Sequence, residues 1–275
     1  SDFIGTKLTM NLGERSYDII IKSGSLENLY QFARLDRRVA VVTDSGVPAQ
    51  YAQRVADQCK DARIITVPQG EASKSFKILE SVLRQMLDFG MGRGDLVVAV
   101  GGGVVGDLAG FAAATYMRGI DFINCPTTTL SMIDSSIGGK TAVDLGDTKN
   151  IVGAFWQPKL VIVDPDTLST LPRRHYINGL AEAVKASLLA DPELFAIFEK
   201  GDIDAQIGEI ICRSLRFKKG IVEQDETEQG MRKALNFGHT IGHGIEAVKG
   251  IKGRRTVGLF HGECVALGML PMIES

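Results

Sequence analysis

Short apolar, β-branched segments recur along the first 165 residues, and segments with helical periodicity separate most of them. The segments that we predict as strands are Tyr17–Ile21, Val39–Thr43, Ile64–Val67, Leu96–Val100, Phe122–Cys125 and Leu160–Val163. The clearest helices between them are Pro48–Cys59 and Ser75–Phe89. Continuous apolar strands that alternate with helices are typical of a mostly parallel sheet covered on both faces, so we predict an α/β domain. Thr6–Ile21, with Asn11-Leu-Gly-Glu between two extended runs, predicts an antiparallel hairpin at the sheet edge.

The pattern changes after Pro165, where we find helical periodicity and no convincing strand. The predicted helices are Glu182–Leu189, Pro192–Phe198, Ile207–Lys219, Arg232–Val248 and Cys264–Met272. We therefore predict a nucleotide-binding α/β domain over residues 1–165 and an all-α domain over residues 166–275. The run Gly262–Ser275 reaches the last residue without a capping glycine or a polar tail, so we expect the natural chain to continue.

Composition and charge exclude several classes of protein. The chain is 44% hydrophobic and 23% charged, which excludes a disordered chain, and its formal charge of −2 argues against a nucleic-acid partner. No apolar run approaches the ~20 residues of a membrane-spanning helix, and the first residues lack a signal-peptide pattern. The four cysteines form no CxxC pair and indicate neither disulfides nor a thiolate zinc site. We predict a cytoplasmic protein with reduced thiols.

Glycine is in excess, at 31 of 275 residues, and its clusters follow predicted strands. Leu96–Val100 runs into Gly101-Gly-Gly-Val-Val-Gly-Asp107 and then into a helix. Glycines let a backbone approach a pyrophosphate closely, and a helix N-terminus offers free N–H groups and the positive end of its dipole. The segment predicts a dinucleotide phosphate loop, and a tight turn that binds nothing is the alternative.

Two more polar segments come after the predicted strand Phe122–Cys125. Pro126-Thr-Thr-Thr129 follows a predicted strand, where hydroxyls commonly face a ligand at the carboxyl edge of a sheet. Ser135–Thr141 places Lys140 in a glycine-rich stretch, which we interpret as a flexible loop. For the second segment, an exposed lysine on a mobile loop is the alternative, but several such loops after consecutive strands favour a nucleotide crevice.

Three of the four histidines lie between positions 239 and 261. His239 and His243 are four residues apart and share a helix face, and His261 follows a loop rich in glycine and basic residues. Glu182 and Lys185 share a face of another predicted helix. Imidazoles with one carboxylate suit a catalytic Zn²⁺ that keeps an open coordination position, whereas ordinary surface histidines are the alternative. The spacing leaves open which three groups bind the metal.

Together, these segments resemble the 3-dehydroquinate synthases, the NAD- and zinc-dependent sugar phosphate cyclases of the shikimate pathway. The matching motifs keep the family's order from about residue 40 onward. They are Gly70-Glu-Ala-Ser-Lys74, Gly101–Asp107, Ala114–Gly119, Pro126–Leu130, Asp134–Lys140, Lys149-Asn150, Gly179–Lys185, Leu235–His243 and His261-Gly-Glu263. The resemblance implies an N-terminal nucleotide-binding domain, a C-terminal helical metal domain, and an active site between them.

The resemblance also implies roles for individual residues. The implied zinc ligands are Glu182, His239 and His261, with Co²⁺ as a substitute metal. The implied NAD contacts are Asp44, Glu71, Lys74, Gly102, Gly103, Val104, Val105, Gly106, Asp107, Thr127, Thr128, Lys149 and Thr170. The implied catalytic and substrate-binding residues are Lys140, Lys185, His243, Asn236, Arg232, Lys218, Asp134 and Asn150. Arg118 is implied to reach the substrate phosphate across a homodimer interface.

The implied enzyme is a lyase of aromatic amino-acid biosynthesis. It converts 3-deoxy-arabino-heptulosonate 7-phosphate into 3-dehydroquinate and phosphate through transient oxidation by NAD⁺, phosphate elimination, reduction and an intramolecular aldol closure. Because this substrate carries a phosphate and a carboxylate, several lysines and arginines must converge on it. The alternatives are another cyclase, such as 2-deoxy-scyllo-inosose synthase, a glycerol-type dehydrogenase, or a non-catalytic NAD-binding relative. Lys218 and Arg232, as a clamp for a carboxylate, argue against a substrate that has none.

Overall fold

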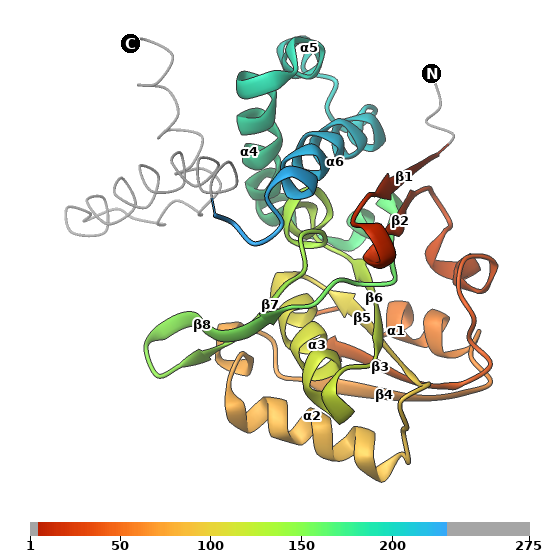
Figure 1. Cartoon of the computed structure of the whole chain (residues 1–275). Helices are drawn as coiled ribbons and strands as arrows, with labels where there is room; N and C mark the ends of the chain where they lie inside the picture. Colours follow the sequence, from red (N-terminus) through yellow and green to blue (C-terminus); the bar gives the residue numbers. More distant parts are fainter. Residues whose placement is uncertain (1–4, 230–275) are drawn as a thin grey trace, which may run out of the picture.

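The computed structural model describes residues 5–229, and their arrangement is shown in Figure 1. A seven-stranded sheet has the strand order β1-β2-β9-β6-β5-β3-β4. Its strands are β1 (Thr6–Met10), β2 (Tyr17–Ile21), β3 (Arg38–Asp44), β4 (Asp61–Val67), β5 (Leu96–Gly101), β6 (Asp121–Pro126) and β9 (Leu160–Val163). Neighbouring strands are parallel except β1 and β2, which pair antiparallel at one edge. The mostly parallel sheet and the edge hairpin predicted from the sequence are confirmed.

Helices cover both faces of this sheet, as its apolar strands require. The helix α1 (Ala49–Ala56) packs on one face, and α2 (Phe76–Asp88) and α3 (Gly103–Thr115) pack on the other. Successive side chains of a strand point to opposite faces, so Val41 belongs to the core beneath α1 while Val42 belongs to the core beneath α2 and α3. The central strands of the sheet are therefore buried on both faces and support the loops that follow them.

A second, two-stranded sheet was not predicted from the sequence. β7 (Lys140–Leu145) and β8 (Thr148–Phe155) form an antiparallel hairpin that runs beside α3 (Figure 1). Our interpretation of Ser135–Thr141 as a flexible loop is therefore wrong for its last two residues, which begin β7. Gly110 lets the hairpin approach α3, because a Cβ there would lie 2.5 Å from Thr141 Cγ2. The hairpin thus extends the α/β layer toward the carboxyl edge of the main sheet.

The described chain after β9 is helical, as predicted. Its helices are α4 (Arg173–Ala190), α5 (Pro192–Lys200) and α6 (Ile207–Gln224), and no strand follows β9 within residues 5–229. Asp191 ends α4 and caps α5, since its side chain accepts a hydrogen bond from the Leu194 N–H at 3.1 Å. The helices predicted at Arg232–Val248 and Cys264–Met272 lie outside the described residues, and the domain boundary at residue 165 stays a prediction. None of the described helices combines the length and apolarity needed to cross a membrane.

The helical part sits directly on the loop that follows β6. A Cβ at Gly179 of α4 would lie 2.4 Å from the Leu130 backbone nitrogen, so only glycine allows this approach. The π-helical turn Ser131–Ser135 lies between this contact and α6. Val161 and Val163 of β9 and Leu180 of α4 belong to one apolar core cluster. One face of α4 and α6 is thereby held over the carboxyl edge of the sheet.

Candidate active site

The glycine-rich segment is a strand-to-helix turn, as the sequence predicts. β5 ends at Gly101 and α3 begins at Gly103, and no side chain within residues 5–229 caps the first turn of α3. A Cβ at Gly101 would lie 2.7 Å from Val105 Cγ2, whereas a Cβ at Gly103 would have Ser135 Oγ as its nearest neighbour, at 3.4 Å. Gly101 is therefore required by the turn itself. The turn itself does not need a glycine at Gly103, because a Cβ there would make only ordinary contact, and this backbone beside the N–H groups of the first helical turn suits a phosphate group.

Further predicted NAD contacts lie at the carboxyl ends of neighbouring strands. Asp44 ends β3, and its Oδ1 accepts hydrogen bonds from the N–H groups of Gly46 at 2.8 Å and Val47 at 3.1 Å. Thr128 follows β6 and shares a 2.7 Å hydrogen bond with Ser131. An acidic residue on the strand beside a glycine-rich turn is the arrangement that binds a nucleotide ribose in doubly wound folds. The structure brings these groups to one edge of the sheet.

Of three other predicted NAD contacts, two are hydrogen-bonded within the protein and one is exposed. The Thr127 N–H donates to the Gly101 carbonyl oxygen at 2.9 Å, and the Thr170 hydroxyl bonds the Tyr51 hydroxyl at 2.7 Å. Lys149 is exposed on β8. Thr127 and Thr170 are thus held by the loops around the sheet edge, while Lys149 has room to reach a ligand.

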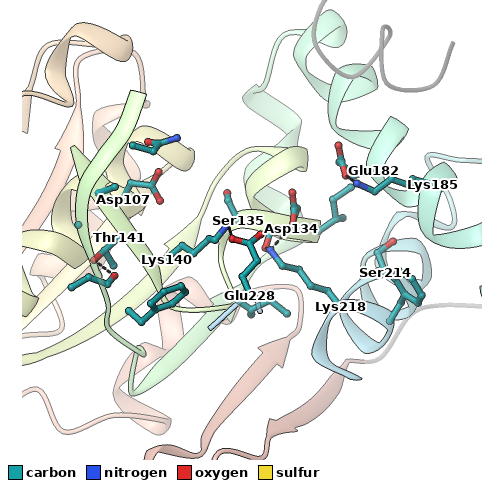
Figure 2. Close-up of a pocket in the computed structure, with 18 of the residues that line it drawn as sticks. Asp107, Asp134, Ser135, Lys140, Thr141, Glu182, Lys185, Ser214, Lys218 and Glu228 are labelled. Carbon is teal, nitrogen blue, oxygen red and sulfur yellow. Dashed lines mark hydrogen bonds and ion pairs between the residues drawn. The ribbon is translucent and has the colours of Figure 1, made fainter. Parts of the chain in front are cut away.

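A cavity of about 510 Å³ lies beside the glycine turn, between the β7–β8 hairpin, the Ser131–Ser135 turn, α4 and α6 (Figure 2). Seven of the predicted site residues line it: Asp107, Asp134, Lys140, Asn150, Glu182, Lys185 and Lys218. They come from six different elements and are separated by up to 111 positions in the sequence, from 107 to 218. The structure therefore assembles one polar site from residues that the family motifs carry separately.

Each lysine of the cavity contacts a carboxylate. Lys185 Nζ lies 3.1 Å from Glu182 Oε2, and both side chains are buried. Lys218 Nζ donates to the carboxylate and the backbone oxygen of Asp134. Lys140 Nζ lies 2.5 Å from Glu228 Oε2 (Figure 2). These pairs hold the lysine side chains at the cavity, where an anionic substrate would meet them.

A buried lysine links the cavity to the predicted NAD contacts. Lys74 is 4% exposed, lies 2.8 Å from Asp107 Oδ2, and donates a hydrogen bond to Asn150 Oδ1. Burial raises the pKa of Asp107, and the Lys74 ammonium opposes that shift. Glu71 Oε1 lies 3.9 Å from the same ammonium. The N-terminal half of α3 and the hairpin are thus joined through one cation.

The predicted metal centre is only partly within the described residues. Glu182 presents a buried carboxylate to the cavity from α4, and such an oxygen donor suits Zn²⁺ or Co²⁺. Its predicted partners His239 and His261 lie outside residues 5–229, as do Arg232, Asn236 and His243. Within residues 5–229 no group of three or more His, Cys, Asp or Glu side chains could hold a metal ion. The donor chemistry of Glu182 fits the predicted metal.

Arg118 does not line the cavity, and other lining residues were missed from the sequence. Arg118 is exposed on the turn after α3 and has a left-handed φ of 66°. The cavity lining also includes Ser135, Phe155, Ser214, Phe217 and Glu228. The turn residues Gly146-Asp147 are the one sequence signal that could have indicated the hairpin that carries Phe155. Nothing in the spacing of Glu228 marks it as a neighbour of Lys140.

Two family models together match residues 64–274 of the chain. The model of the 3-dehydroquinate synthase N-terminal region matches residues 64–178, and that of the C-terminal region matches residues 179–274. The 3-dehydroquinate synthase of Pelobacter propionicus is 44% identical over 276 residues, covering 96% of this chain and 76% of the relative. The chain belongs to the 3-dehydroquinate synthase family. The two matched regions meet within α4, thirteen residues beyond the boundary predicted at residue 165 (178 against 165).

Solved structures of related cyclases have the same fold. That of 2-deoxy-scyllo-inosose synthase complexed with carbaglucose-6-phosphate, NAD⁺ and Co²⁺ has a TM-score of 0.82 and 28% identity, and the match covers 96% of this chain and 75% of that one. That of 2-epi-5-epi-valiolone synthase from Streptomyces hygroscopicus subsp. jinggangensis 5008, with NAD⁺ and Zn²⁺ bound, has a TM-score of 0.79 and 29% identity, covering 94% and 74%. The dehydroquinate synthase-like fold predicted from the motifs is confirmed.

Proposed function

We propose that this protein converts 3-deoxy-arabino-heptulosonate 7-phosphate into 3-dehydroquinate and phosphate. The observation that carries the proposal is the convergence of Lys140, Lys185 and Lys218 on one cavity, in a chain that is 44% identical to a 3-dehydroquinate synthase. Three ammonium groups from three elements suit a substrate with a phosphate at one end and a carboxylate at the other. A simple dehydrogenase substrate would need no such set.

NAD⁺ and a divalent metal are the cofactors of the proposed reaction. Two cyclase neighbours hold NAD⁺ together with Co²⁺ or Zn²⁺, and the glycine backbone at the start of α3 and the buried carboxylate of Glu182 suit the same groups here. When bound, NAD⁺ would supply hydride transfer and the metal would acidify a substrate hydroxyl. The Gly101–Asp107 backbone would hold the pyrophosphate, with Asp44 at the ribose. Glu182, His239 and His261 would hold the metal.

The remaining site residues would bind and orient the substrate. Lys218 and Arg232 would hold the carboxylate, and Asp134 fixes Lys218 by accepting its hydrogen bonds. Lys140 and Asn150, from the two strands of the hairpin, would face the reacting ring. Lys185, Asn236 and His243 would complete the polar lining near the metal. Held around the substrate, these groups would fix the geometry of each step.

The substrate class can be tested directly. We expect phosphate release when the enzyme is incubated with the heptulosonate phosphate, NAD⁺ and Zn²⁺, and none with glucose 6-phosphate, which carries a phosphate but no carboxylate. Turnover of glucose 6-phosphate without turnover of the heptulosonate would overturn the proposal. It would favour the inosose-type cyclase, whose fold is shared at a TM-score of 0.82.

We also propose that the enzyme is a cytoplasmic homodimer. The exposed Arg118, held in a left-handed backbone conformation next to exposed Met117, is suited to reach a neighbouring copy rather than its own cavity. Light scattering of the purified protein should give twice the chain mass. A monomer with full activity would contradict a role for Arg118 across an interface.

Lys218→Met should raise the KM for the heptulosonate phosphate by about 10- to 150-fold, because one charge-assisted contact is worth ~1.5–3 kcal/mol. The NAD⁺ affinity and the metal content should not change, since Lys218 contacts neither predicted cofactor site. The matched control is Lys219→Met, because Lys219 pairs with Glu223 at 2.7 Å and does not line the cavity. Steady-state kinetics of both variants are the measurement. An equal effect of the two substitutions would contradict the carboxylate clamp.

A further inference from the structure

The β7–β8 hairpin is irregular at one residue, Asp144. Val143 lies opposite Val152, but Leu145 lies opposite Thr148, so the single residue Asp144 faces three residues of β8. Those three are Lys149, Asn150 and Ile151, and the first two are predicted site residues. A bulge of this kind bends a strand and re-aims the side chains within it. The irregularity therefore directs site residues from β8.

Asp144 satisfies the backbone that the bulge leaves unpaired. Its Oδ1 accepts a hydrogen bond from the Asn150 N–H at 2.8 Å. Asn150 has a φ of 57°, the left-handed conformation that asparagine tolerates better than most residues but that still needs support. The carboxylate of Asp144 thus holds the conformation in which the Asn150 side chain reaches the cavity.

The backbone of Asp144 joins the hairpin to the segment after β4. The Asp144 N–H donates to the Lys74 carbonyl oxygen at 2.8 Å, and the Lys74 ammonium donates to Asn150 Oδ1. With the bond from Asn150 to Asp144, these contacts close a ring of three residues. Lys74 also lies 2.8 Å from Asp107 Oδ2 on α3. A change at Asp144 would therefore reach two residues that line the cavity, Asn150 directly and Asp107 through Lys74.

The charges around Asp144 keep it an acceptor. Burial and a hydrogen bond to Asp144 raise the pKa of Glu71. At Asp144 desolvation is outweighed by the hydrogen bonds from Asn150 and Glu71, which hold the pKa of Asp144 below its ordinary value. The ammonium groups of Lys74 and Lys149 act in the same direction. Asp144 is thus the stronger acid of the two carboxyl groups.

We propose that Asp144 is a positioning residue of the active site, which fixes the hairpin bulge so that Asn150 and Lys74 face the bound substrate and cofactor. The proposal rests on the proposed function for the identity of the reaction, but the geometry of the ring does not. Misplacing a site group by about 1 Å can cost about 10²-fold in rate. Asp144→Ala should therefore lower kcat by about 10- to 100-fold.

The decisive comparison is Asp144→Ala with Asp144→Asn. Asparagine keeps an oxygen that can accept the Asn150 N–H, so its kcat should stay within about fivefold of the unmodified enzyme. Asp147→Ala, in the hairpin turn and outside the cavity lining, should leave kcat unchanged. Full kcat in Asp144→Ala, or an equal loss in both Asp144 variants, would overturn the proposal.

Hydrogen exchange of the Asn150 amide tests the same ring without any turnover. Protection of this amide should fall at least tenfold in Asp144→Ala and persist in Asp144→Asn, while the core amides of β5 stay protected in both. If the unmodified enzyme fails to turn over the heptulosonate, the proposed function fails while this measurement still decides the role of Asp144. Unchanged protection in Asp144→Ala would overturn that role.

Discussion

Glu182→Gln is expected to abolish retention of the divalent metal and to lower kcat/KM by about 10³-fold. A metal that acidifies a hydroxyl supplies several kcal/mol of transition-state stabilisation, and each ~1.4 kcal/mol is a factor of ten in rate. Glutamine has nearly the shape of glutamate and can still accept a hydrogen bond from Lys185, but it lacks the anionic oxygen that the metal needs. The substitution therefore removes the charge and leaves the packing of α4 in place.

The control for this prediction is Lys185→Met on the same helix. Lys185 Nζ lies 3.1 Å from Glu182 Oε2, so methionine removes the competing cation and leaves the carboxylate available. We expect this variant to retain metal and to lose activity. Elemental analysis after dialysis and the melting temperature of both variants are the measurements. Metal retained by Glu182→Gln but lost by Lys185→Met would show that Glu182 is not a ligand.

The sheet could be predicted because its strands carry their own signal. Segments such as Leu96–Val100 are buried on both faces, so they read as unbroken apolar runs. β8 carries no such signal, since it is exposed along nearly its whole length and includes Lys149 and Asn150. Two glycines, Gly138 and Gly139, precede β7, and adjacent glycines in a sequence are typical of a loop. In the structure both have a positive φ. The hairpin was therefore missed where the glycines and polar residues of the site are densest.

The site residues, too, could be predicted from the sequence only in part. The family motifs supplied Lys74, Asp107 and Asn150 as separate residues, and the structure brings them together. Lys74 and Asn150 are 76 positions apart, and no periodicity or spacing relates them. Asp144 carries no motif, because its effect depends on a register shift that only the paired strands reveal. Sequence reasoning thus found the groups that carry charge and missed the residue that orients two of them.

Gly103→Val is expected to weaken NAD⁺ binding by at least about 100-fold while the protein stays folded. A Cβ at this position meets no protein atom closer than Ser135 Oγ at 3.4 Å, and no positive φ is required there. The side chain would instead fill the space before the first turn of α3, where the pyrophosphate would accept hydrogen bonds from free N–H groups. Losing two charge-assisted hydrogen bonds at ~1.5 kcal/mol each gives about this factor.

Gly101→Ala is the matched control, because it adds a smaller side chain only two residues away. We expect it to lower the stability of the protein, whereas Gly103→Val should lower the NAD⁺ affinity. Its Cβ would lie 2.7 Å from Val105 Cγ2, a stiff β-branched side chain in the core beneath α2 and α3. Overpacking of this kind typically costs about 1–3 kcal/mol of stability. Calorimetric titration with NAD⁺ and thermal unfolding of both variants separate the two effects. A folded Gly103→Val variant with unchanged NAD⁺ affinity would mean that the pyrophosphate binds elsewhere and that the turn is only structural.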